Sequence, residues 1–114
     1  MTPERTVGLI GVPTDVGASH RGASMGPEAL RVAGLHAALE SHDLAVLDHG
    51  NLAGPRNPGA GPVGGYRHLD EVYAWNRLVH DAVYGELQAG RLPVMLGGDH
   101  CLAIGSIGAV ARHC

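Results

Sequence analysis

The 114-residue chain contains no lysine, no phenylalanine, only two cysteines, and no apolar run long enough to cross a membrane. Its N-terminal segment lacks the apolar stretch of a secretory signal, so a cytoplasmic protein is expected. Cys101 and Cys114 have neither zinc-site spacing nor the pattern of a disulfide framework, so reduced thiols are expected. The net charge of −3 gives no electrostatic reason to expect nucleic acid or an anionic membrane as a partner.

The apolar content of 45% and the charged content of 17% suit a soluble globular protein. Three short apolar runs, residues 6–12, 44–47 and 92–96, have the length of buried strands. Helical patterns alternate with these runs, and this alternation predicts an α/β fold with a parallel sheet. The length leaves room for one domain, so residues 1–114 are expected to lie within a single domain.

The first predicted helix follows a glycine-rich loop, residues 14–26, and has Pro27 and Glu28 in its first turn. The small and apolar residues that recur with helical spacing along it are Leu30, Ala33, Gly34, Ala37 and Ala38.

The second helix is predicted to begin near Asp70 and Glu71 and to end at Gly90. The residues of its apolar stripe are Leu69, Val72, Val79, Val83 and Leu87. Tyr73, Trp75 and Tyr84 are expected to pack rather than to form a binding site. Residues 101–111 are expected to be helical.

Residues 52–66 are rich in proline and glycine and are predicted to form a loop. Residues 59–64 match the glycine pattern of a dinucleotide-binding turn. That pattern must leave a strand directly and open a helix. Because this one lies inside the loop, we reject the dinucleotide-binding interpretation.

The most informative stretch is Gly97-Gly98-Asp99-His100, which follows the third predicted strand. Ligands of open α/β sheets bind at the carboxyl ends of strands, and the two glycines allow a sharp turn and a close backbone approach. His100 could therefore project into a crevice as a metal ligand or a general base. The alternative from these residues alone is a turn histidine that only caps a helix.

Four stretches, taken in order, resemble the N-terminal part of the ureohydrolase superfamily, and most of all arginase. They are Gly11–Gly17 with Arg21-Gly22, Gly26–Leu35, Asp48–Leu52 and Leu96–Ile107. The resemblance implies a three-layer α-β-α fold with a parallel sheet, of which only the first three strands and their helices are expected here. It also implies two manganese ions per subunit and hydrolysis of the guanidinium group of L-arginine to ornithine and urea.

Carried over to this sequence, the resemblance makes His100 one manganese ligand. Asp99, with Gly97 and Gly98, is expected to shape the turn or hold the ligand in place rather than bind metal. Arg21 matches a loop arginine near the family's substrate entrance, and a solvated loop arginine is the equal alternative. The family usually has serine where Cys101 stands, and we interpret Cys101 as a small buried residue rather than a soft-metal ligand.

The family's other metal ligands lie on Asp-x-His-x-Asp and Asp-x-Asp motifs, and neither motif occurs in these residues. The resemblance therefore assigns no catalytic residue to this segment. We expect an N-terminal fragment that is inactive alone, part of a homotrimer or homohexamer when complete, acting on a small guanidino substrate. An agmatinase, another guanidino hydrolase and a non-catalytic truncated product remain as alternatives.

Overall fold

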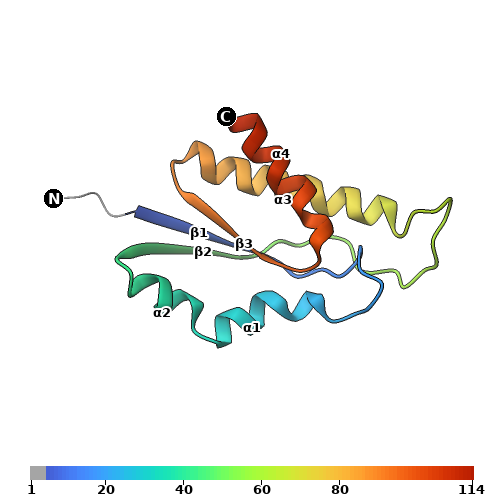
Figure 1. The fold of residues 1–114 in the computed structure, drawn as a ribbon, viewed down its shortest axis with the longest axis horizontal. Helices are drawn as coiled ribbons and strands as arrows, with labels where there is room; N and C mark the ends of the chain where they lie inside the picture. Colours follow the sequence, from blue (N-terminus) through green and yellow to red (C-terminus); the bar gives the residue numbers. More distant parts are fainter. Residues whose placement is uncertain (1–4) are drawn as a thin grey trace.

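Three parallel strands form the central sheet of the chain, for which a computed structural model describes residues 5–114. The strands are β1 (Arg5–Val12), β2 (Leu44–Asn51) and β3 (Leu92–Gly97), in the order β2-β1-β3 (Figure 1). β1 therefore has a strand on each side. Because the strands are parallel, their carboxyl ends lie at one edge of the sheet, which is the edge where such folds place ligands.

Helices cover both faces of this sheet, which confirms the predicted three-layer α/β arrangement (Figure 1). One face carries α1 (Gly26–Val32) and α2 (Leu35–Glu40), and the other carries α3 (Leu69–Gln88) and α4 (Ala103–His113). The remaining helical segments are two short 3-10 turns, η1 (Ala23–Met25) and η2 (His100–Leu102).

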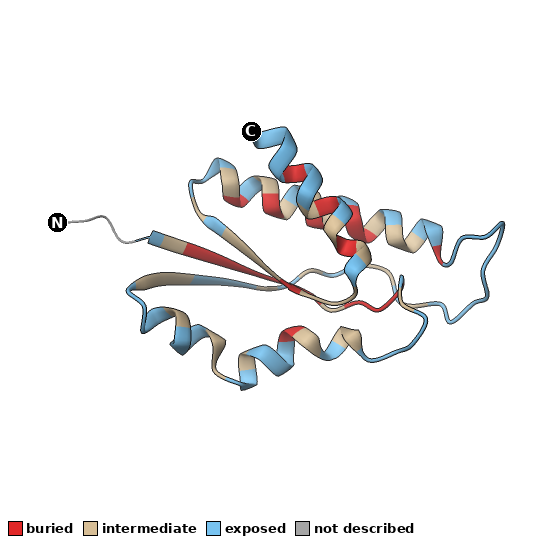
Figure 2. Cartoon of the chain, in the orientation of Figure 1, coloured by how far each residue is buried: buried red, intermediate tan, exposed pale blue. Residues whose placement is uncertain are grey.

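The two faces of the sheet bury very different amounts of apolar side chain (Figure 2). The core on the α3/α4 face consists of Ile10, Val12, Val16, Trp75, Val79, Val83, Leu102 and Ala109. Within residues 5–114, the core on the α1/α2 face has three buried residues, Val7, Leu9 and Leu96. Alternate residues of β1 point to opposite faces of the sheet, so this one strand supplies both cores.

α3 ends where the sequence predicts. Gly90 adopts a left-handed conformation with φ +77°, and its N–H donates to the carbonyl of Leu87 at 3.0 Å. The N–H of Arg91 donates to the carbonyl of Glu86 at the same distance. This pair of hydrogen bonds is the Schellman motif, which a glycine at this position favours.

The aromatic residues of α3 differ in burial, and Tyr84 is half-buried and packs against the core, as predicted. Trp75 is 4% exposed and packs in the core, as predicted. Tyr73 is 63% exposed, so the prediction that it packs is wrong. Leu69, placed in the apolar stripe, is also exposed, because it is the first residue of the helix and lies beyond the end of the sheet.

The first predicted helix differs most from the sequence-based expectation. It is broken at Gly34, whose φ of +95° ends one helix and begins the next. The break rotates α2, so that Leu35 and Leu39 pack toward the sheet while Ala37 and Ala38 face solvent. Leu30 and Ala33 are exposed as well. The alanines carry too little apolar surface to set the orientation, and the two leucines bury more.

β2 is longer than predicted, because Asp48–Asn51 continues the strand instead of following it. Residues 52–68 contain no helix and no strand beyond an isolated bridge between Val63 and Tyr66, which confirms the predicted loop. Among the residues that the structure describes, no helix combines the length and the apolar character needed to span a membrane.

Candidate functional site

The turn that follows β3 is fixed by close backbone contacts that require glycine. Gly98 has φ +77°, and a Cβ atom at this position would lie 2.5 Å from the carbonyl oxygen of Val12. A Cβ atom at Gly26 would likewise collide with the carbonyl oxygen of Gly97. The turn is therefore packed directly against the end of β1 and the start of α1, so side chains at these glycines would displace it.

Asp99 joins this turn to the loop that follows β1. Its backbone N–H donates to the carbonyl of Thr14 at 3.1 Å. One carboxylate oxygen accepts the N–H of Gly17 and the other accepts the N–H of Cys101, both at 2.8 Å. Asp99 is thus the N-cap of η2 and a cross-link between two loops at the carboxyl edge of the sheet.

His100 is the first residue of η2, directly after this cross-linked turn, and its side chain is exposed. Residues 5–114 contain no group of three or more histidine, cysteine, aspartate or glutamate side chains that could hold a metal ion. An exposed imidazole at the end of a strand fits one nitrogen ligand of a larger metal site. The described residues do not fit a complete site by themselves.

Cys101 is a half-buried, uncharged thiol. Burial, together with the neighbouring carboxylate of Asp99, raises the pKa of Cys101 to about 12. Its sulfur lies so close to Gly17 that a Cβ atom there would be 2.8 Å away. The thiolate is the form that binds soft metals, so this environment favours a packing role.

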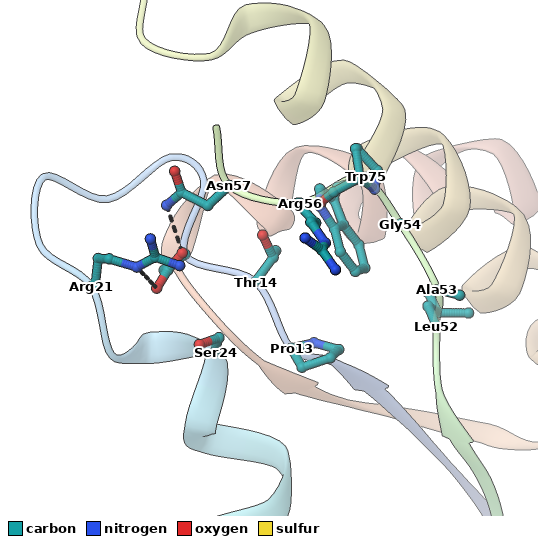
Figure 3. Close-up of a pocket in the computed structure, with 12 residues that line it drawn as sticks. Pro13, Thr14, Arg21, Ser24, Leu52, Ala53, Gly54, Arg56, Asn57 and Trp75 are labelled. Atoms are coloured by element: carbon teal, nitrogen blue, oxygen red, sulfur yellow. Dashed lines mark hydrogen bonds and ion pairs between the residues drawn. The ribbon is translucent and has the colours of Figure 1, made fainter. Parts of the chain in front are cut away.

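Arg21 lies on the loop after β1, at the mouth of a cavity of about 600 Å³ (Figure 3). Its side chain is 76% exposed, and its Nε atom lies 4.0 Å from a carboxylate oxygen of Asp15. Residues of the loop after β1, of the chain after β2 and of α3 line this cavity, and none comes from Gly97–His100. The structure therefore places Arg21 and His100 at the same edge of the sheet but not in one cavity.

Asp15 and Asn57 form a second link at this edge that the sequence did not reveal. The carboxylate of Asp15 is buried and accepts the side-chain N–H of Asn57 at 2.7 Å and the backbone N–H of Gly22 at 3.1 Å. These donors, with the charge of Arg21, hold the pKa of Asp15 below its usual value despite burial. Asp15 thus ties the long loop after β2 to the loop after β1.

Arg31 makes a third link, from α1 to the end of β2. Its guanidinium donates twice to Asp48, at 2.9 and 3.0 Å, and once to the side-chain oxygen of Asn51 at 2.6 Å. Hydrogen bonding to Arg31 keeps the pKa of Asp48 below its usual value. A Cβ atom at Gly11 would collide with Asn51, so the small residue makes room for this network.

A family model described as "Arginase family" matches residues 5–114. The arginase of Brevibacillus brevis is 38% identical over 109 residues, which is 96% of this chain and 37% of that protein. The crystal structure of the Bacillus caldovelox arginase matches with a TM-score of 0.87 and 37% identity, again over 96% of this chain and 37% of that one. An Entamoeba histolytica arginase in complex with L-ornithine is 28% identical with a TM-score of 0.85, over 99% of this chain and 38% of that one. The chain thus spans little more than a third of the length of these relatives.

Proposed function

Because this chain belongs to the arginase family, we propose that it contributes one metal ligand to the manganese-dependent hydrolysis of L-arginine to ornithine and urea. The relatives that support arginine as the substrate are named arginases and are 33–38% identical. A relative crystallised with L-ornithine supports ornithine as the product. Since the chain covers only part of these relatives, the proposed activity belongs to a protein that also supplies the remaining ligands.

The observation that carries this proposal is the position of His100. It lies at the carboxyl edge of a parallel sheet, on a turn that Asp99 ties to the loop after β1. When bound, two manganese ions would lower the pKa of a water molecule and so supply hydroxide as the nucleophile for the guanidinium carbon. In this chain His100 would hold one of the ions through a neutral ring nitrogen. Asp99 would act as a positioning residue, because both of its carboxylate oxygens accept backbone N–H groups.

Arg21 is the described residue that the proposed substrate entrance would use. Its guanidinium is exposed and is held near Asp15, so it can face solvent without leaving the loop. Repulsion between this positive charge and an incoming guanidinium group would disfavour a non-productive orientation of the substrate. A solvated arginine without effect on the substrate is the alternative for this position.

Two other functions remain as second candidates. Structures named as a hypothetical agmatinase of Burkholderia thailandensis and a formiminoglutamase of Trypanosoma cruzi are 24% and 23% identical, so their likeness supports the shared fold alone. A guanidino hydrolase that prefers agmatine, or a truncated product without catalysis, is therefore distinguished by assay. A cytoplasmic homotrimer or homohexamer that binds neither nucleic acid nor membrane completes the proposal, in keeping with the net charge of −3.

The test uses a protein that carries this segment followed by the remaining family motifs. We expect urea release from arginine in the presence of manganese, and little from agmatine. The chain of 114 residues alone should release no urea above a metal-only control, because one histidine cannot hold two ions. Preference for agmatine would support a guanidino hydrolase specific for agmatine. Absence of both activities would support a truncated product without catalysis.

Replacing His100 tests the metal role directly. The variant His100→Ala should lower the bound manganese from two ions toward one per subunit and strongly reduce turnover. His42→Ala is the matched control, because His42 is also exposed but lies in the turn before β2, away from the carboxyl edge. Two tightly bound ions in the His100→Ala protein would remove His100 from the site.

A further inference from the structure

A cavity at the carboxyl ends of β1 and β2 contains none of the residues proposed to hold or position the metal, although Arg21, proposed for the substrate entrance, lies at its mouth. Its volume is about 600 Å³, and its walls come from the loop after β1, the chain after β2 and Trp75 of α3 (Figure 3). No residue of the turn from Gly97 to His100 lines it. Its chemistry can therefore be considered independently of the metal.

The carboxylate of Asp15, which lines this cavity, already has hydrogen-bond partners and a nearby positive charge. Asp15 accepts hydrogen bonds from Asn57 and Gly22, and its side chain is only 4% exposed. Arg21 lies beside it at 4.0 Å and balances its charge. A buried carboxylate with these partners needs no further cation, so a positively charged ligand gains nothing from Asp15.

The positive charge of Arg56, the second arginine that lines the cavity, is not balanced by a carboxylate. Arg56 is exposed, and within residues 5–114 its guanidinium makes no hydrogen bond to a side chain or carbonyl and no ion pair. In Figure 3 the Arg56 side chain lies between Asn57 and the indole of Trp75. The contact of Arg21 with Asp15 is made by Nε, which leaves its terminal N–H groups available. Two guanidinium groups thus line one cavity that contains one neutralised carboxylate.

We propose that this cavity binds a small oxyanion, a phosphate or a carboxylate, through Arg56 and Arg21. Each guanidinium offers a planar pair of N–H donors that matches two oxygens of such a group. The wall on the far side is rigid, because the indole N–H of Trp75 donates to the carbonyl of Pro55 at 2.8 Å and its ring packs on Gly54.

The test is a titration of the 114-residue chain followed by ¹⁵N NMR. Trp75 is the single tryptophan, so its indole N–H gives one peak, and the loss of a peak in Arg56→Gln identifies the Nε–H of Arg56. Inorganic phosphate and, separately, acetate are added at constant ionic strength. We expect both peaks to move in a saturable way with at least one of these ions. In Arg56→Gln the apparent Kd should weaken about tenfold, and in Arg21→Gln by a smaller factor.

The matched control is Arg5→Gln. It removes the same charge from an exposed arginine at the amino end of β1, the opposite edge of the sheet, and should leave the apparent Kd unchanged. Saturation with phosphate alone would assign the site to phosphate, and saturation with acetate alone would assign it to carboxylates. Peak movement that sodium chloride reproduces, or an unchanged Kd in Arg56→Gln, would overturn the proposal. Neither result bears on arginine hydrolysis, because no metal or urea assay is involved.

Discussion

The helices on the two faces of the sheet are attached to it by different kinds of contact. α3 and α4 pack over a core of eight buried residues, including Val79 and Leu102, which are fully buried. α1 and α2 cover only three buried residues and bury a single residue of their own, Pro27, among those of the two helices. What holds α1 to the sheet in addition is the hydrogen-bonded guanidinium of Arg31.

The comparison shows that the helices on the two faces of one sheet can be held in place by different interactions. Burial of apolar area is non-directional, so it fixes α3 and α4 in proportion to the surface they cover. The Arg31 network is directional and joins a few atoms, so it fixes the position of α1 relative to the end of β2. Arg21 and Asp99 lie on the segments that follow β1 and β3, at the carboxyl edge of the sheet.

The largest effect is expected from removing core volume on the α3/α4 face. Leu102→Ala should lower the free energy of unfolding by roughly 2–5 kcal/mol, because Leu102 has no exposed surface and its neighbours cannot fill the space. Leu39→Ala makes the same chemical change on the α1/α2 face, where the side chain is only partly buried. Its cost should be about 1 kcal/mol. Denaturation with urea measures both, and equal costs would contradict the contrast between the faces.

The Arg31 network should give an intermediate effect. Arg31→Ala leaves Asp48 and Asn51 without their shared donor, so we expect a loss of about 1–3 kcal/mol, concentrated in α1. Arg31→Lys keeps the charge but loses the planar fork, and should recover only part of the loss. Amide hydrogen exchange in α1 and β2 locates the change.

Arg77→Ala is the control for this experiment. Arg77 is an exposed arginine on α3, whose one side-chain hydrogen bond, to Tyr73, is 3.4 Å long. Its removal should change the free energy of unfolding by less than about 0.5 kcal/mol. If Arg77→Ala and Arg31→Ala had equal effects, the network would not be what holds α1.

These contrasts also explain which parts of the fold could be predicted from the sequence. The strands and α3 could be predicted, because continuous apolar runs and the glycine that ends a helix, Gly90, are local signals. The break at Gly34 could not, because the alanine spacing fits an unbroken helix and only the burial of Leu35 and Leu39 selects the rotated one. The local sequence pattern does not predict the orientation of a helix whose small residues leave that orientation to be set by tertiary packing.

The candidate site divides in the same way. The place of Asp99 and His100 at a strand end follows from a local motif. The pairing of Asp15 with Asn57 joins residues 42 positions apart on two loops, and neither loop has a periodicity that would report it. Such contacts are set by the path of the loops after the sheet has formed, so a single sequence does not contain a local signal for them.

The smallest effect expected is a pH dependence that belongs to the α1/α2 face. Arg31 lowers the pKa of Asp48, so the folded state favours the ionised carboxylate more than the unfolded chain does. The stabilisation is therefore complete above the pKa of an unfolded aspartate, near 3.8, and is lost as the pH falls through the lower folded value. Because the pair is partly solvated, the loss should be at most about 1 kcal/mol.

Asp15 and Glu86 also have lowered pKa values, so acid weakens other parts of the chain at the same time. The Asp48 contribution is the difference between the wild type and Asp48→Asn, each unfolded with urea at several pH values from about 6 to 3. Asp48→Asn should be less stable at pH 6, where the ion pair is intact, and the two curves should converge on acidification. Hydrogen exchange should place the convergence in α1 and β2, which the pair joins, and not in α4, which lies on the other face of the sheet. If the two curves ran parallel, the charge of Asp48 would not contribute to the stability, and Arg31 would hold α1 by packing and uncharged hydrogen bonds.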